Sequence, residues 1–217
     1  MTPKTLDHIA LWLADRDAVA DALLEPYDLH VIDRTDRFTL VGHDARRGKL
    51  TLFDADGPRE PGALKHVALR VSDIDGAPAV LDAGQGLEVR LVEAETDSEY
   101  DLDHVALFSN DPEATAREYE RYGFDSARPS PQGHPRVEVA GAYVEFHPGD
   151  PGNPERPLLN HLAVLVDSAE AHKDEAERTG IEVADFVDAA NTLAVFVWLP
   201  EHVKLEYVEH KPTFSLV

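Results

Sequence analysis

The chain has 217 residues, and its 42 acidic and 20 basic side chains give a formal charge of −22 at pH 7. This charge repels nucleic acid and anionic membrane surfaces, so we expect neither as a partner. The chain has no cysteine, which excludes disulfides, thiolate nucleophiles and cysteine-ligated zinc or iron–sulfur sites. Any strong metal site must therefore use His, Asp and Glu.

No segment predicts a membrane span. The longest apolar runs, such as residues 193–199, have the length of a strand, whereas a spanning helix needs about 20 apolar residues. Residues 1–7 contain no charged leader followed by an apolar core, so no signal peptide is predicted. We expect a cytoplasmic protein.

Four segments repeat the pattern Leu, any residue, His, aliphatic, Ala, aliphatic. They are LDHIAL at 6–11, LKHVAL at 64–69, LDHVAL at 102–107 and LNHLAV at 159–164. A single His on a strand is more often a structural residue than a ligand, but four in register indicate an internal repeat. Common ancestry can produce such a repeat with or without a present function for each histidine.

Each motif predicts a short strand, because it is an aliphatic run bounded by turn residues. Strand alternation places His104, Ala106 and Phe108 on one face, and Val105 and Leu107 on the other. Each motif His therefore shares its face with a small Ala, which leaves space beside the imidazole.

A helix is predicted after the strand in the clearer copies. In the third copy Asp111 is the expected N-cap, the helix covers 112–122, and Gly123 ends it. In the fourth copy Ser168 caps a helix that runs to Arg178. Further strands are predicted at 143–146 in the third copy and at 182–188, 192–199 and 203–208 in the fourth.

The second copy is shortened, because the interval from its His to the next is much shorter than the other two intervals. We predict that it keeps a strand, a helix and one strand at 87–95, and that it has lost its last two strands. The acidic connector at 96–101 then separates two predicted domains. These are an amino-terminal degenerate pair at 1–95, with modules 1–60 and 61–95, and a complete pair at 101–217, with modules 101–150 and 158–217.

A βαβββ unit that opens with Leu-x-His and closes with Leu205-Glu206-Tyr207 resembles the vicinal oxygen chelate superfamily. That superfamily includes glyoxalase I, extradiol dioxygenases, methylmalonyl-CoA epimerase, and fosfomycin and bleomycin resistance proteins. The resemblance implies an α+β fold of tandem βαβββ modules, here four modules paired into cupped mixed sheets. It also implies a divalent metal held by the first and last strands of the modules, and a small oxygen-chelating substrate.

The resemblance implies metal ligands in the carboxy-terminal pair. Its third module offers His104 and Glu145, and its fourth offers His161 and Glu206. The amino-terminal pair retains two motif histidines, His8 and His66, but has Thr51 at the position of the carboxylate. The hypothesis is that His8 and His66 are ancestral remnants or structural residues.

Three functions remain open. Two imidazoles and one carboxylate form the facial triad of Fe(II) enzymes, which favours an extradiol-dioxygenase-like reaction with Fe(II) or Mn. A second carboxylate favours a glyoxalase or epimerase type of isomerase or lyase with Ni, Zn, Co or Mn, in which Glu145 is the catalytic base. The third alternative is a protein that binds a drug or metabolite without chemistry.

The residues expected around the substrate do not decide between these functions. We assign substrate contacts to Tyr143, His147, Phe196 and Trp198. Phe196 and Phe186 stand where extradiol dioxygenases have a Tyr and an acid–base His, which counts against that class unless His134 or His147 transfers the proton. A homodimer is possible, because the shortened module leaves a strand edge that a second chain could cover.

Overall fold

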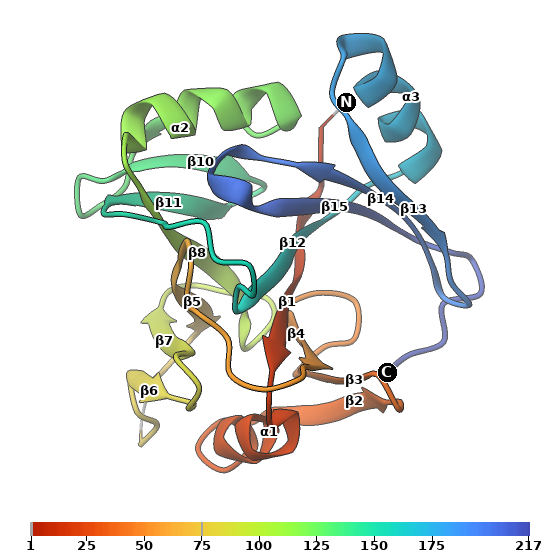
Figure 1. Ribbon diagram of the computed structural model, residues 1–217. Helices are drawn as coiled ribbons and strands as arrows, with labels where there is room; N and C mark the ends of the chain where they lie inside the picture. The colour runs from red at the N-terminus through yellow and green to blue at the C-terminus, as the bar shows by residue number, and fades with distance from the viewer. Residues whose placement is uncertain (1, 75) are drawn as a thin grey trace.

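The computed structural model describes residues 2–74 and 76–217, and its strands form two mixed sheets (Figure 1). The first unit comprises β1 (Thr5–Leu13), α1 (Arg16–Leu24), β2 (His30–Arg34), β3 (Phe38–Gly42) and β4 (Lys49–Asp54). The second comprises β5 (Leu64–Val71), β6 (Val80–Asp82) and β7 (Glu88–Glu93). The third comprises β8 (Asp101–Ser109), α2 (Pro112–Tyr119), β9 (Arg128–Pro129), β10 (Pro135–Val139) and β11 (Ala142–Pro148). The fourth comprises β12 (Leu159–Leu165), α3 (Ala169–Thr179), β13 (Val183–Asp188), β14 (Thr192–Trp198) and β15 (Lys204–His210).

The predicted α+β fold of paired βαβββ units is confirmed, but the units do not pair in chain order. Sheet one has the strand order β13-β14-β15-β12-β1-β4-β3-β2, and it joins the fourth unit to the first. Sheet two has the order β6-β7-β5-β8-β11-β10-β9, and it joins the second unit to the third. In both sheets the two motif strands meet at the centre as an antiparallel pair.

The predicted division into pairs at 1–95 and 101–217 is therefore corrected by the sheet topology. All four motif strands carry the same apolar pattern, so the pattern does not specify which two of them hydrogen-bond to each other. The short connector after β7 returns the chain directly to β8 beside β5. The strands β1 and β12, which lie far apart in the sequence, are then left to pair with each other.

The second unit is shortened in a different way from the prediction. The strand predicted at 87–95 is present as β7, and it runs parallel to the motif strand β5. This is the relation that β4, β11 and β15 have to their own motif strands, so β7 is the last strand of its unit. Within the described residues the unit has no helix and one strand fewer, and the short strand β6 covers the outer edge of β7.

Strand alternation determines which face of each sheet is packed. The residues that follow the motif histidines, Ile9, Val67, Val105 and Leu162, are all fully buried in one continuous apolar core. The histidine-bearing faces are therefore the opposite, concave faces. Burial of the aliphatic face is the main stabilising term, at about 25 cal/mol per Å² of apolar surface.

The helix boundaries follow the predicted caps. Asp111 accepts a hydrogen bond from the backbone of the first turn of α2, and Gly123 ends the following 3-10 turn with φ of 93°. Ser168 caps α3 in the same way. None of the helices in the described part of the chain is long and apolar enough to cross a membrane.

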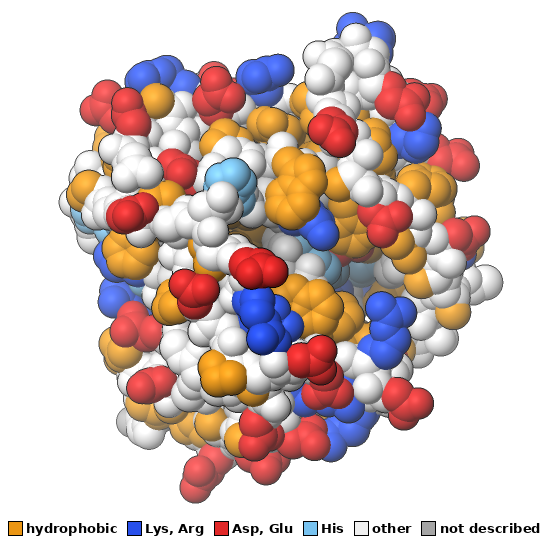
Figure 2. Space-filling view, viewed as in Figure 1, with side chains coloured by type: hydrophobic (Ala, Val, Ile, Leu, Met, Phe, Trp, Pro, Cys, Tyr) orange, Lys and Arg blue, Asp and Glu red, His pale blue; other side chains and the backbone are white. Residues whose placement is uncertain are grey.

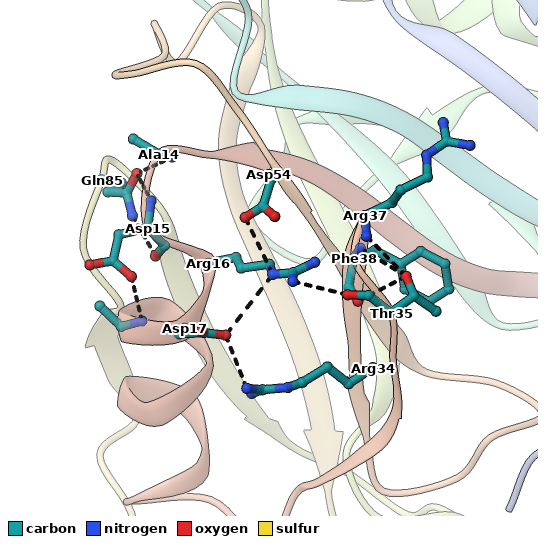
Figure 3. Close-up of polar contacts among 11 residues, drawn as sticks. Ala14, Asp15, Arg16, Asp17, Arg34, Thr35, Arg37, Phe38, Asp54 and Gln85 are labelled. Atoms are coloured by element: carbon teal, nitrogen blue, oxygen red, sulfur yellow. Dashed lines mark hydrogen bonds and ion pairs between the residues drawn. The ribbon is translucent and has the colours of Figure 1, made fainter.

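A polar contact fastens the first unit to the second. The amide oxygen of Gln85 accepts from the backbone N–H of Ala14 at 2.7 Å, and its Nε2 donates to the Asp15 carbonyl at 2.8 Å. Figure 3 shows Gln85 against the start of α1, where the Asp15 side chain also caps the helix. On the same helix Arg16 donates to the Thr35 carbonyl, which holds the β2–β3 hairpin against α1. The two sheets are thereby connected outside their shared core.

Candidate metal centre

The central strand pair of sheet one brings two motif histidines together. In the antiparallel register His8 lies opposite Ala163 and His161 lies opposite Ala10, so each imidazole occupies the space above a small residue. The two Nε2 atoms are 3.1 Å apart, and the rings meet edge to face with centroids 5.2 Å apart. Both nitrogens therefore point at the same place on the concave face.

A carboxylate joins this pair from β15. That strand runs parallel to β12, and its Glu206 lies beside Ala163. Glu206 Oε2 is 2.8 Å from His161 Nε2 and 3.2 Å from His8 Nε2. His8, His161 and Glu206 thus form a cluster of three ligand atoms that could hold one metal ion.

The fourth position of the set is filled by a hydroxyl side chain. On β4, Thr51 lies beside Ala10 in the same register that places Glu206 beside Ala163. Thr51 is buried. Sheet one therefore offers two imidazoles and one carboxylate rather than two of each, which is the donor set of a facial triad.

The residue before each histidine orients its ring. His8 Nδ1 lies 2.8 Å from an Asp7 carboxylate oxygen, and His161 Nδ1 lies 3.1 Å from the Asn160 side-chain oxygen. Each acceptor favours the tautomer with a proton on Nδ1, which leaves the Nε2 lone pair directed at the cluster. Metal-binding histidines characteristically have such acceptors behind them.

Asp7 belongs to a wider charged group at the floor of the site. It lies at a bulge of β1, almost wholly buried, with Lys49 Nζ at 2.8 Å and His210 Nε2 at 2.9 Å. Burial alone would raise the pKa of the Asp7 carboxyl, but Lys49, His210 and His8 hold it well below its usual range. Asp7 is therefore ionised and keeps His8 in place.

The charges of the cluster suit a cation. Burial by itself lowers the pKa of His8, but the Glu206 and Asp7 carboxylates raise it to about 9. Burial raises the pKa of Glu206, and the two histidines outweigh that effect and lower it to about 2. The buried Glu206 carboxylate is thus balanced by the positive charge of the protonated His8 imidazole. A divalent ion bound between the same three ligand atoms would displace that proton.

The cluster lies in a cavity of about 330 Å³. Phe53 and Phe196 flank His161, with ring centroids 6.5 and 5.3 Å from its imidazole. At the other end of the cavity the lining includes Phe214 and Leu216 from the carboxy-terminal segment. Figure 2 shows a hollow in which His surface lies at the bottom among hydrophobic side chains.

Sheet two repeats the histidine pair. His66 and His104 also have Nε2 atoms 3.1 Å apart and ring centroids 5.2 Å apart. Tyr143 stacks on His104 at 4.6 Å. Glu145 lies beside Ala106, which is the position of Glu206 in sheet one.

The other polar groups of sheet two are arranged differently. Glu145 Oε1 is 2.5 Å from His147 Nε2, while its Oε2 is buried without a hydrogen-bond partner among the described residues. Arg90 lies beside Ala68, the position that Thr51 has in sheet one. Lys65 precedes His66 where the other units have Asp or Asn, and it contacts His147 Nδ1 at 2.8 Å. As a result His66 Nδ1 has no partner within the described chain.

The four predicted ligands are thus divided between the sheets. His161 and Glu206 lie together in sheet one, whereas His104 and Glu145 lie together in sheet two with the predicted substrate residues Tyr143 and His147. The predicted substrate residues Phe196 and Trp198 are on β14 in sheet one.

His8 is not among the four ligands predicted from the sequence. The hypothesis that it is a remnant rested on the lack of a carboxylate in the first unit, whereas the carboxylate that lies beside it comes from the fourth unit. The signal was present in the shared motif. A search of every possible pairing of the four motif strands would have included the combination of His8 with His161 and Glu206.

Comparison with known proteins supports the fold. No family model matches the chain, and no curated protein matches it in sequence. Among solved structures, a Bacillus subtilis protein provisionally described as a dioxygenase matches with a TM-score of 0.76 and 15% identity, over 98% of this chain and 87% of that one. Glyoxalase I from Zea mays matches with a TM-score of 0.71 and 15% identity, over 94% and 92% of the two chains.

These structural matches extend over all four units, and both proteins are built on the architecture that the repeated motif predicts. At such low identity they establish the fold and leave the reaction to the chemistry of the site. The chain has the fold of the vicinal oxygen chelate superfamily.

Proposed function

We propose that this protein is a metal-dependent enzyme whose ion is held by His8, His161 and Glu206, and that it catalyses an extradiol-type oxygenation of a small substrate with two adjacent oxygen donors. The observation that carries the proposal is the donor set in sheet one. Two imidazoles and one carboxylate on one side of an ion leave several positions open, which suits Fe(II) and, next to it, Mn. When bound, such an ion brings a chelating substrate and dioxygen together.

The isomerase alternative requires a second carboxylate at the metal, one that moves a proton on the substrate. The fourth position of the sheet-one site is Thr51, which has no suitable base. Glu145, to which the sequence interpretation gave this role, lies in sheet two and is hydrogen-bonded to His147. The donor set therefore favours the dioxygenase-like reaction over the glyoxalase-like one.

A proton acceptor for the substrate is available within the same cavity. His134 and His147 were the candidates from the sequence, but their rings pack against each other at sheet two, 3.9 Å apart and tilted by 43°. His210 lines the sheet-one cavity and is held by Asp7 on one side and by the Phe214 ring on the other. We assign to His210 the removal of a proton from a substrate hydroxyl.

Metal analysis with oxygen uptake tests the proposal. After anaerobic reconstitution we expect one Fe(II) per chain, and oxygen uptake with a panel of catechols. The variant His161→Ala should lose both, while the matched variant His104→Ala in sheet two should keep both. A protein that binds no metal after reconstitution, or one whose metal content survives His161→Ala, would overturn the proposal.

The variant His210→Asn separates metal binding from proton transfer. It should retain iron and lose most of its turnover, because general acid–base groups contribute about 10²- to 10⁴-fold. Unchanged turnover would remove His210 from the mechanism and leave the metal site standing.

A further inference from the structure

A second cavity lies farther along the histidine-bearing face of sheet one. It lies beyond the candidate metal site formed by His8, His161 and Glu206, which we call the metal cluster. Its volume is about 450 Å³, and its lining includes Trp12, Asn160, Trp198 and Lys204 together with residues of the 151–157 segment. We refer to this cavity as the tryptophan chamber. It falls in the size range of small-molecule sites.

Strand geometry connects the chamber with the metal cluster. On β15, Lys204 lies two residues before Glu206, and on the paired strand Trp198 lies two residues beyond Phe196. Trp12 likewise lies two residues beyond Ala10 on β1. Two residues along a strand advance about 7 Å on the same face. The chamber therefore begins about 7 Å beyond the metal cluster, roughly the length of one small aromatic ring.

Aromatic side chains flank His161 and continue along the strands toward the chamber. The Trp12 ring lies 5.2 Å from that of Phe53, and Phe53 lies 6.5 Å from His161. On the other side Phe196 lies 5.3 Å from His161, and Trp198 follows it along β14. Flat aromatic walls of this kind favour a flat, conjugated ligand through stacking.

Trp198 is open to an incoming molecule, and Trp12 is partly buried. Trp198 is 47% exposed, which places it among the few large hydrophobic side chains exposed in the described part of the chain. The opposite end of the concave face is bordered by residues 189–192 and by Phe214 and Leu216. A substrate with a metal-chelating head therefore has space for the rest of its body on the tryptophan side.

Cationic groups lie on both indole rings. Lys204 Nζ is 5.0 Å from the Trp198 ring, and the Arg59 guanidinium is 5.6 Å from the Trp12 ring. Two carboxylates also line the chamber. Glu201 uses one oxygen to accept from the Ser109 and Thr115 hydroxyls.

The second carboxylate is that of Glu155, which is exposed in the linker between β11 and β12. Among the described residues Lys204 is the one Lys or Arg in the chamber lining, and a ligand group that meets its ammonium beside the Trp198 ring is best matched by an anion.

We infer that the substrate has a flat aromatic or conjugated body bearing an anionic group, and that this body occupies the tryptophan chamber while the oxygen donors of the head reach the metal cluster. The inference rests on the proposed function for the identity of the head. It assigns recognition of the body to stacking on Trp12 and Trp198 and to the charge of Lys204.

Binding measured without metal tests this inference separately from catalysis. The probes are 2-naphthoate and its neutral counterpart 2-naphthamide, titrated calorimetrically into the metal-free protein. The chain has two Trp residues, and both line the chamber, so NMR of their indole N–H groups reports where a probe binds. We expect 2-naphthoate to bind and to shift both indole signals.

Three variants distinguish stacking, charge and metal. Trp198→Ala should weaken both probes about tenfold, and Lys204→Gln should weaken 2-naphthoate about tenfold and 2-naphthamide hardly at all, as expected for stacking and for an ion pair at a partly desolvated site. Glu206→Ala removes a metal ligand and should leave both affinities unchanged.

The inference is overturned if 2-naphthoate does not bind, or if it binds equally well to Trp198→Ala or to Lys204→Gln. If the reconstituted protein takes up no oxygen but the metal-free protein still binds the probe, only the proposed function is contradicted. Loss of probe binding in a protein that still takes up oxygen would contradict the inference alone.

Discussion

The two sheets contain the same histidine pair in different electrostatic surroundings. In sheet one His8 and His161 have a carboxylate in contact with both Nε2 atoms and an acceptor behind each Nδ1. In sheet two His66 and His104 have nearly identical separation, yet Glu145 is hydrogen-bonded to His147 instead. The same pair of imidazoles therefore lies among two different sets of neighbouring donors.

The difference can be traced to two positions in the second unit. The residue before the motif His is Asp7, Asp103 or Asn160 in the other units and Lys65 in this one. The residue beside the motif Ala is Thr51, Glu145 or Glu206 in the others and Arg90 here.

Both replacements introduce a positive charge next to His66, which disfavours a cation. Burial and the Arg90 guanidinium also lower the pKa of His66 to about 3. We therefore expect one metal ion per chain, bound in sheet one.

The largest effect is expected from the carboxylates. Glu206→Ala should lose the metal, with an affinity lower by on the order of 100-fold or more, because a ligand contributes at least as much as the groups that orient it. Glu145→Ala and Thr51→Ala should keep one ion per chain. Metal content by mass spectrometry after dialysis against a fixed free metal concentration measures this. Metal loss in Glu145→Ala would reverse the roles assigned to the two sheets.

A second test attempts to make the sheets alike. The double variant Lys65→Asp, Arg90→Thr gives sheet two the side chains that sheet one has at the matching positions, Asp7 and Thr51, while Glu145 already lies at the position of Glu206. We expect the stoichiometry to rise from one ion per chain to two, and His66→Ala added to the double variant should return it to one. If the unaltered protein already binds two ions, the positive charges of Lys65 and Arg90 do not prevent metal binding in sheet two.

The acceptor behind His8 should have a smaller effect. Asp7→Asn keeps the size of the side chain and removes the charge that orients His8, and groups in this position contribute about 10- to 100-fold to metal affinity. The matched variant Asp103→Asn, behind His104, should leave the metal affinity unchanged. Competition with a chromophoric chelator measures both. Equal effects in the two variants would indicate a general electrostatic change rather than orientation of a ligand.

Within a single pH unit, the dependence of metal affinity on pH is expected to be small. The pKa of His8 in the metal-free protein is raised to about 9, chiefly by Glu206 against the opposing effect of burial, so the metal must displace this proton at neutral pH. The metal affinity should therefore rise about tenfold per pH unit from about 7 toward 9. Calorimetry in buffers of different ionisation enthalpy should show release of about one proton. An affinity independent of pH over this range would contradict the shared-proton arrangement.

The same shift has a consequence for the stability of the metal-free protein. Because the folded pKa lies above the unfolded value of 6.5, the His8 contribution is fully present below pH 6.5 and is lost as the pH rises through about 9. Thermal unfolding of the metal-free protein should show a decrease of Tm across that window. In the variant His8→Gln, the Tm should change less with pH over the same window.

Much of the fold could be predicted from local patterns. The repeated motif, the capping residues Asp111 and Ser168 and the strand alternation all depend on neighbours in the sequence, and the structure confirms them. The shortened second unit was predicted from spacing, but its surviving strand was assigned to the wrong place in the unit. Spacing measures how many residues are missing, whereas only the parallel pairing of β7 with β5 shows which strand remains.

By itself, the sequence determined the unit, its motif and the type of ligand, because hydrophobic alternation and the absence of cysteine are local and compositional properties. Only the tertiary structure decided which units share a sheet, and hence that Glu206 lies beside His8 and His161 rather than beside His104. The physical reason is that the four motif strands have interchangeable apolar patterns, so their pairing is determined by the connections and packing of the whole chain. A metal site built across two such strands takes its composition from that pairing.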